Sequence, residues 1–216
     1  WLRVYIAEIN SRWYDYDGNP YHFGFLDFVI DEQLSIDYLG NYAKQVTWSA
    51  QEAGYSNVEE NNIMVIAAVF NPEKNLCYSK PPNKNPFYAY FVDATAAAKP
   101  GETGNNIVTE DYTHTVFCED ATFTIGPYCP DTAEALYSLY ESGDYPFYFV
   151  EMICDKVLSA LYYLKNNYNL YAVPTTYFDG GYKVVLGAYA ENIYRDRVEN
   201  SAKREVHDMD LSVSAV

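Results

Sequence analysis

The chain has 216 residues, with 14 Lys and Arg against 30 Asp and Glu, so its formal net charge at pH 7 is −16. This balance excludes a typical nucleic-acid-binding protein, because contact with phosphates depends on clustered Lys and Arg. Hydrophobic residues make up 49% of the chain and aromatic residues 18%, which excludes intrinsic disorder, and no apolar run is long enough to span a membrane.

The first part of the chain, residues 1–104, has a strand-type pattern. Its apolar residues gather in short runs, separated by turn clusters of Asn, Asp, Gly and Pro, and no helical period is evident between them. This pattern predicts an antiparallel β-sandwich. The predicted strands are 2–9, 23–30, 45–48 and 63–70, followed by a long loop (71–86), an edge strand (88–92) and a linker (94–104).

The second part, residues 105–207, alternates between strand and helix patterns. A run of apolar residues is followed by a helical pattern twice, and a hairpin with a Gly-Gly turn comes next. This order predicts a βαβαββα arrangement. The expected elements are a strand (112–123), a helix (129–140), a strand (147–154), a helix (155–166), a hairpin (175–178 and 183–186) and a last helix (189–207).

Two short motifs in this second part carry a resemblance. The first is Gly126-Pro127-Tyr128-Cys129-Pro130, and the second is Val173-Pro174-Thr175, followed by Phe178-Asp179-Gly180-Gly181. Together they resemble the thioredoxin and glutaredoxin superfamily, in which a Cys-x-x-Cys pair begins a helix and a cis-proline faces it. The resemblance implies a thioredoxin-like α/β domain in which Gly126 replaces the attacking cysteine and Cys129 keeps the resolving position.

The missing thiol decides the expected chemistry. Thiol–disulfide exchange needs one thiolate that attacks and a second thiol that resolves the mixed disulfide. Gly126 cannot attack, so Gly126, Cys129 and Pro174 are expected to form a degenerate site without redox activity. Asp120 matches the buried acid that the family uses for proton transfer, and its expected role here is structural. Cys129 remains a candidate for a lone reactive thiol, a buried residue or a disulfide partner.

The remaining ligand-type side chains predict no metal centre. His22, His114 and His207 are scattered, without Cys or carboxylates at a zinc-like spacing. No phosphate-binding Gly loop or nucleophile elbow is present, so no cofactor is expected.

The four cysteines, Cys77, Cys118, Cys129 and Cys154, allow two disulfides in three connectivities, or none. A Cys118–Cys154 bridge is one candidate, because these residues are expected on neighbouring strands of a thioredoxin-type sheet. A bridge requires Cα atoms within about 7 Å.

The chain ends in a strand-type segment, residues 208–216, in which Leu211, Val213 and Ala215 alternate with polar residues. The N-terminal strands and this segment resemble secreted bacterial and archaeal proteins that join a thioredoxin-like domain to a β-sandwich, as in one group of outer-membrane proteins, but in the opposite order. The strand is expected to fold back as part of a permuted domain, to complete the sandwich of a neighbouring copy, or to mark an excised repeat.

These observations predict an α+β protein of two domains, an antiparallel β-sandwich (1–104) and a thioredoxin-like α/β domain (105–207), with a donor or swapped strand at 208–216. The expected function is that of a non-catalytic structural protein that assembles into a filament with other copies of itself by strand donation. The absence of an initiator Met and the acidic, Lys-poor composition favour an extracellular or cell-surface location. The alternative is a secreted oxidoreductase-like or peptide-binding protein that uses Cys129 and the Pro174 face.

Overall fold

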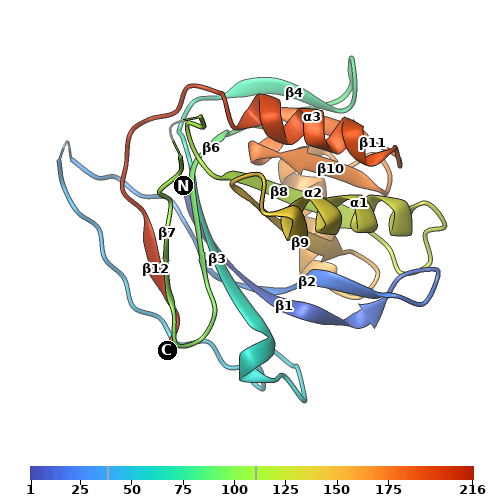
Figure 1. Ribbon diagram of the computed structural model, residues 1–216, viewed down its shortest axis with the longest axis horizontal. Helices are drawn as coiled ribbons and strands as arrows, with labels where there is room; N and C mark the ends of the chain where they lie inside the picture. Colours follow the sequence, from blue (N-terminus) through green and yellow to red (C-terminus); the bar gives the residue numbers. More distant parts are fainter. Residues whose placement is uncertain (38, 110) are drawn as a thin grey trace.

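The computed structural model describes residues 1–37, 39–109 and 111–216. Its main feature is an eight-stranded mixed sheet with the order β11-β10-β8-β9-β2-β1-β3-β6 (Figure 1). Two further strand pairs, β4–β5 and β7–β12, lie outside this sheet. The elements are β1 (Leu2–Tyr14), β2 (Pro20–Glu32), η1 (Glu60–Asn62), β3 (Ile63–Phe70), β4 (Asn75–Lys80), β5 (Lys84–Ala89), β6 (Val92–Ala98), β7 (Thr103–Asn105), β8 (Val116–Thr122), α1 (Cys129–Ser142), β9 (Phe147–Ile153), α2 (Leu158–Tyr168), β10 (Thr175–Phe178), η2 (Asp179–Gly181), β11 (Lys183–Leu186), α3 (Glu191–Ser201) and β12 (Ser212–Ser214).

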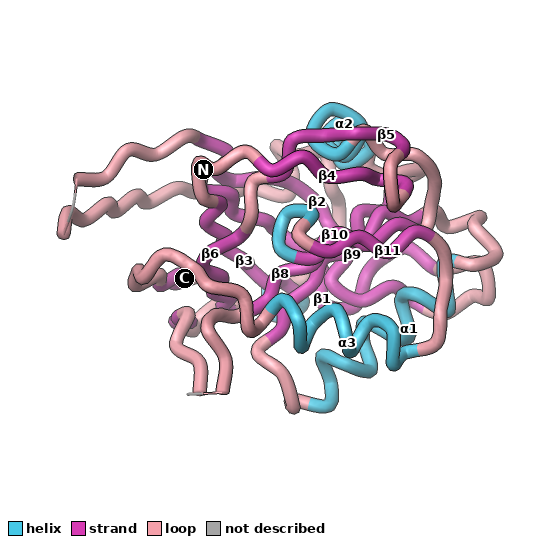
Figure 2. Tube along the Cα trace, turned by 90° about the horizontal axis from the view of Figure 1, so that it is seen from above, coloured by secondary structure: helices cyan, strands magenta, loops and turns pink. Residues whose placement is uncertain are grey.

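The region from β8 to α3 confirms the predicted βαβαββα order of strands and helices. β9 runs parallel to β8, whereas β10 is antiparallel to both β8 and β11. Helices α1 and α3 cover one face of these strands and α2 covers the other (Figure 2). Among the described residues, no helix is long and apolar enough to cross a bilayer.

The N-terminal strands continue this sheet, so the expected two-domain β-sandwich is not confirmed. β2 lies beside β9, and β1, β3 and β6 follow in turn. The irregular segments 33–37 and 39–59 and the β7–β12 pair lie over one face of these strands, while α2 and the β4–β5 hairpin lie over the other (Figures 1 and 2). The domain boundaries at residues 104 and 207 stay predictions.

Gly24 occupies the junction between the N-terminal strands and the thioredoxin-like region. β2 and β9 run parallel there, with Gly24 in register with Glu151. A Cβ atom at Gly24 would lie 2.5 Å from Ser11 Oγ and 2.8 Å from Ser11 Cβ, closer than non-bonded atoms approach. Glycine at this position therefore leaves room for the Ser11 side chain of β1.

The sheet curls so that strands far apart in its order meet. Tyr5 of β1 donates a hydrogen bond of 2.9 Å to Glu119 of β8, although β9 and β2 lie between their strands. Tyr168 of α2 donates to the other oxygen of the same carboxyl. Burial raises the pKa of Glu119, and the nearby Arg3 guanidinium opposes that shift. A buried polar cluster thus fills the concave face beneath α2.

The η2 turn joins the two ends of the curled sheet. Asp179 accepts a hydrogen bond of 3.0 Å from the Phe117 amide of β8, and its other oxygen lies 2.7 Å from His114 Nε2. Gly180 has φ 67°, and a Cβ there would lie 2.2 Å from the Tyr90 carbonyl oxygen just before β6. The Asp-Gly-Gly sequence therefore serves close packing between β8 and the start of β6.

Three segments differ from the prediction. Residues 45–48 form no strand; Trp48 instead packs beside Ile6 and Leu26. The predicted loop 71–86 contains β4 and part of β5, whose hairpin turn includes Pro81 and Pro82. The predicted linker 94–104 contains most of β6, all of whose residues are buried, and Gly104 passes close to its backbone: a Cβ at Gly104 would lie 1.8 Å from the Ala97 carbonyl oxygen.

The predicted C-terminal strand is present as β12, paired antiparallel with β7 of the same chain. Val213 is opposite Gly104, and Ser214 is opposite Thr103. Ala215 continues the contact, because its amide donates to Glu102 and its carbonyl accepts from Gly101, at 3.2 and 2.8 Å. Pairing between two chains stays a prediction.

The junction at Gly24 can be tested by Gly24→Ala. Because the new methyl group overlaps Ser11, overpacking is expected to lower the free energy of unfolding by about 1–3 kcal/mol. Urea unfolding measures this loss. Ser11→Gly removes the overlapping atoms, so the double variant is expected to lose less than the sum of the two single losses. Strictly additive losses would show that this overlap does not constrain the junction.

Candidate functional site

The degenerate site lies at the start of α1. Gly126 forms a turn in which its amide donates to Phe123 and its carbonyl accepts from the Cys129 amide, both at 3.1 Å. Cys129 is the first residue of α1, and Pro130 in the first turn needs no hydrogen-bond acceptor. The sequence Gly-Pro-Tyr-Cys-Pro therefore builds the turn and helix start of a thioredoxin-type site with a hydrogen atom where the attacking thiol would be.

Cys129 is completely buried. Burial raises the pKa of its thiol, and hydrogen bonds to Thr122 and the Phe123 backbone only partly oppose this. Because the thiolate is the reactive form of cysteine, a buried thiol with a raised pKa is a poor nucleophile. The position at the helix start does not activate Cys129.

The bond between Val173 and Pro174 is cis, as the motif predicted. Thr175 is in register with Ala121, so extending the antiparallel pairing by one residue places Pro174 opposite Thr122. The Pro174 carbonyl accepts a hydrogen bond of 2.9 Å from Gly187. Thr122 therefore lies between the cis-proline and Cys129, and the structure brings both predicted site residues to one end of β8.

Two carboxyl groups lie beneath this site. Asp120 of β8 is in register with Glu151 of β9, and both side chains are completely buried. One Asp120 oxygen accepts a hydrogen bond of 3.0 Å from Thr176. The other Asp120 oxygen and both Glu151 oxygens are buried without a hydrogen-bond partner among the described residues.

Burial determines the titration of this pair. It raises the pKa of Asp120 to about 7, although the neighbouring Glu151 and the hydrogen bond from Thr176 oppose the rise. Burial also raises the pKa of Glu151 well above its usual range, and the neighbouring Asp120 raises it further. The pair is therefore arranged to hold a proton, with Glu151 as the stronger proton holder.

Glu151 and Tyr21 are residues of this cluster that the sequence analysis did not identify. Tyr21 of β2 contacts the Thr122 hydroxyl at 3.0 Å and donates to the Phe123 carbonyl at 3.1 Å. Glu151 had a detectable signal, because it is the only charged residue in the apolar strand Phe147–Ile153. Tyr21 had none, because its partners come from strands about a hundred residues away.

The cysteines are all free thiols in the structure. The candidate Cys118–Cys154 bridge is wrong for a geometric reason: Cys118 is opposite Phe149, five residues before Cys154 on the parallel strand. Five strand residues span about 16 Å, whereas a disulfide needs Cα atoms within about 7 Å. Cys77 is separate from the other thiols, on the β4–β5 hairpin.

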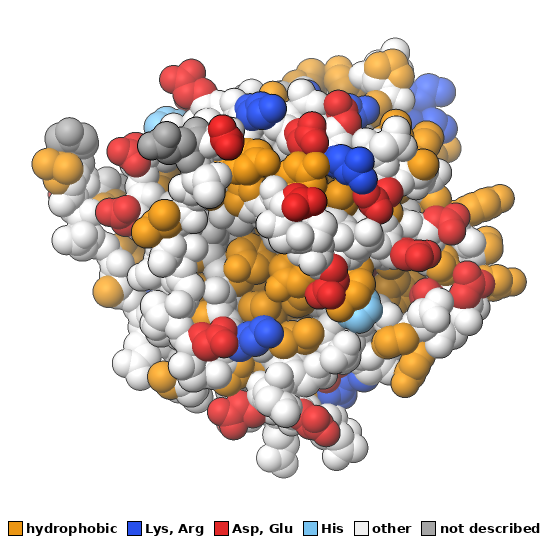
Figure 3. Space-filling model, in the orientation of Figure 1, with side chains coloured by type: hydrophobic (Ala, Val, Ile, Leu, Met, Phe, Trp, Pro, Cys, Tyr) orange, Lys and Arg blue, Asp and Glu red, His pale blue; other side chains and the backbone are white. Residues whose placement is uncertain are grey.

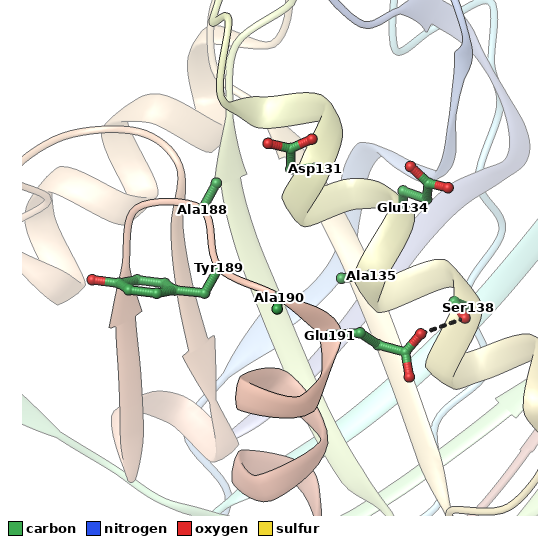
Figure 4. A pocket seen from close by; sticks show the side chains of 8 residues that line it. All are labelled: Asp131, Glu134, Ala135, Ser138, Ala188, Tyr189, Ala190 and Glu191. Carbon is green, nitrogen blue, oxygen red and sulfur yellow. Dashed lines mark hydrogen bonds between the residues drawn. The ribbon is translucent and has the colours of Figure 1, made fainter.

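A pocket of about 520 Å³ lies beside the degenerate site, between α1 and the beginning of α3 (Figure 4). Three carboxylates line it, from Asp131, Glu134 and Glu191. Glu191 accepts a hydrogen bond of 2.9 Å from Ser138 of α1 and another from Arg195. Asp131 and Glu191 lie in the first turns of their helices, where negative charge offsets the helix dipole. These two acids thus stabilise the helices that form the pocket.

Acidic side chains are spread over the face of the molecule that carries α1, and apolar side chains gather in a hollow near its centre (Figure 3).

Across residues 1–37, 39–109 and 111–216, no cluster of three or more His, Cys, Asp or Glu side chains is placed to hold a metal ion. Asp15 accepts hydrogen bonds from the amides of Asp17 and Asn19 in the turn between β1 and β2.

Comparisons with known proteins find only a distant structural likeness. No family model matches the chain, and no curated protein matches it. Among solved structures, a mutant thioredoxin from Halobacterium salinarum NRC-1 is similar over 42% of this chain and 78% of that chain, with 17% sequence identity and a TM-score of 0.36. The thioredoxin-like description of β8 to α3 therefore rests on strand order and the cis-proline.

The degenerate site can be tested by restoring the missing thiol with Gly126→Cys. An ideal Cβ at this position lies 2.5 Å from Cys129 Sγ, too close for a non-bonded contact. A disulfide between the two residues relieves this crowding, so incubation with oxidised glutathione is expected to remove two titratable thiols. Insulin reduction in the presence of dithiothreitol is expected to increase above the wild-type rate.

Two matched variants serve as controls for this experiment. Gly126→Ser adds a side chain of similar size without a thiol, and Gly126→Cys combined with Cys129→Ala removes the resolving partner. Neither is expected to form the internal disulfide or to increase insulin reduction. If Gly126→Cys folds and both thiols stay free after treatment with oxidised glutathione, the site lacks thioredoxin-type geometry.

Proposed function

We propose that this protein is a non-catalytic structural protein of the cell surface or extracellular space that assembles with further copies of itself. Assembly occurs by exchange of the C-terminal segment, residues 208–216. The proposal rests chiefly on β12, a short strand that occupies an apolar surface of the sheet and follows an irregular connection. The burial and raised pKa of Cys129 support the non-catalytic part of the proposal.

Apolar contacts of β12 supply one part of the binding surface. Leu211 and Val213 are partly buried and pack against a cluster that includes Leu2, Val4 and Ala67. The intervening Ser212 is exposed. A neighbouring copy presents the same cluster, so an identical segment from another chain would find the same contacts there.

Hydrogen bonds of this segment fix the register of β12 against β7. The Asn106 side chain accepts from the Leu211 amide and donates to the Met209 carbonyl, both at 2.9 Å. The Thr103 and Ser214 hydroxyls lie 2.7 Å apart. Main-chain pairing combined with pockets for alternate side chains is the recognition mode of strand addition. The segment therefore has the features of a specific donor strand.

The connection before β12 sets where exchange would begin. Asp93 of β6 is buried and contacts two residues that precede the segment 208–216: Arg204 at 3.2 Å and His207 at 2.7 Å. Residues 208–210 follow without regular structure. These two contacts of Asp93 hold the chain in place up to His207, so the hinge for exchange is the short segment 208–210. A head-to-tail exchange of this kind produces a filament unless its rotation closes a ring.

Substitution of adjacent strand residues tests the apolar contact. Val213→Asp places a charge in the apolar cluster, and Ser212→Asp places the same charge on the exposed side of the same strand. Val213→Asp is expected to reduce the assembled fraction at least about ten-fold, a loss of about 1.4 kcal/mol in binding. Sedimentation velocity measures assembly. Equal effects of the two variants would contradict binding through this face.

A mixing experiment tests exchange itself. Thr103 and Ser214 are opposite one another, so chains carrying only Thr103→Cys are mixed with chains carrying only Ser214→Cys, both in a Cys77→Ser background. After assembly and mild oxidation, exchange is expected to produce disulfide-linked pairs of the two different chains on non-reducing gels. A double variant that cross-links only within single chains in the assembled fraction would show that exchange does not occur.

One observation favours a second candidate, a peptide-binding protein that uses the Pro174 face. Ile125 and Tyr128, which flank the degenerate motif, are 71% and 67% exposed. Such exposed apolar side chains beside a cis-proline are suited to an extended peptide. The oxidoreductase-like form of this alternative requires wild-type insulin reduction that Cys129→Ala abolishes, an outcome that would contradict the non-catalytic proposal.

A further inference from the structure

We propose that Asp120 and Glu151 form a proton-sharing pair that holds β2 against β9 in acidic and neutral solution and loosens this junction in alkaline solution. The inference concerns the stability of the single chain and is independent of the assembly proposed above.

The position of the pair links it to the junction. Glu151 is the residue of β9 that is in register with Gly24 of β2, and Asp120 is the residue of β8 that is in register with Glu151. Three carboxyl oxygens of the pair are buried without a hydrogen-bond partner among the described residues. An unpaired carboxylate in such a place costs much more than a protonated carboxyl group that donates to its neighbour.

The groups packed around the pair offer no compensating positive charge. Neither carboxyl takes part in an ion pair among the described residues. The titratable groups that act electrostatically on the pair are acids or hydroxyl and thiol groups: Tyr21 of β2, Cys118 of β8, Cys129 of α1, Cys154 after β9, Tyr177 of β10, Tyr194 of α3 and Asp15 of the β1–β2 turn.

The direction of the pH effect follows from where the protons are held. In the unfolded chain both carboxyls lose their protons near pH 4. In the folded chain burial raises the pKa of both, so the folded state keeps protons that the unfolded state has lost. The stabilising effect of the pair is therefore complete below about pH 4 and decreases as pH rises toward the folded pKa values.

Strand β2 is the element whose movement would relieve an ionised pair. It covers β9 on the side away from β8, and only Gly24 is in register with β9 at this junction. Separation of β2 from β9 would admit water to the Glu151 carboxylate while leaving the pairing of β8 with β9 and β10 intact. Alkaline loosening is therefore expected at this junction before the thioredoxin-like strands open.

The first test compares unfolding at several pH values in wild type, Glu151→Gln and the exposed control Glu52→Gln. For each proton retained by the folded state, the unfolding equilibrium constant of wild type is expected to increase about ten-fold per pH unit. Glu151→Gln removes one titrating group and is expected to flatten this dependence. Glu52→Gln changes the net charge equally and is expected to keep the wild-type slope; identical slopes in all three proteins would overturn the proposal.

A second test needs no variant and uses wild-type protein with labelled carboxyl carbons. Nuclear magnetic resonance is expected to show one Glu carboxyl that remains protonated at pH 7, and hydrogen exchange is expected to increase at β2 amides before β8 amides as pH rises, after correction for intrinsic exchange. Titration of every Glu near its ordinary pKa would overturn the proposal. Simultaneous opening of β2 and β8 would also overturn the proposal, because alkaline loosening would then not begin at the β2–β9 junction.

Discussion

The approach of β2 to β9 is the constraint on which the rest of the structure depends. A thioredoxin-like unit ordered as β11-β10-β8-β9 would present β9 as an edge strand, and an exposed edge is open to pairing with another chain. Here β2 covers that edge, with Gly24 in register with Glu151 of β9. Because β1, β3 and β6 follow β2, this one junction joins the N-terminal strands and the thioredoxin-like region into a single sheet.

Covering β9 also changes the chemistry beneath the degenerate site. Glu151 is completely buried between neighbouring strands, and the adjacent Asp120 offers it no positive charge. On the other face, Glu119 is satisfied by Tyr5 and Tyr168, because the curled sheet brings β1 to β8. The core therefore contains two kinds of buried acid: Glu119 is stabilised by hydrogen bonds, and the Asp120–Glu151 pair is stabilised by protonation. Cys129 is buried next to this pair and has no attacking thiol beside it.

Several parts of the fold could be predicted because they depend on local signals. The helix at Cys129, the Asp179-Gly180-Gly181 turn and the terminal strand around Val213 each combine turn residues with a clear apolar period. The Ala-rich β6 was missed, because Ala is a poor indicator of strands. Trp48 was mistaken for part of a strand because it lies in an irregular segment whose apolar side chains pack over Ile6 and Leu26 of the sheet.

The sequence by itself determined the α/β order of the second part, the loss of the attacking thiol at Gly126 and the cis-proline position, since each depends on residues that are close together in the chain. Only the tertiary structure decided that the N-terminal strands extend the same sheet, that Glu151 meets Asp120, and that Cys118 lies far from Cys154. The physical reason is that strand pairing and register arise between distant segments, where burial and backbone hydrogen bonding act together and leave no local pattern.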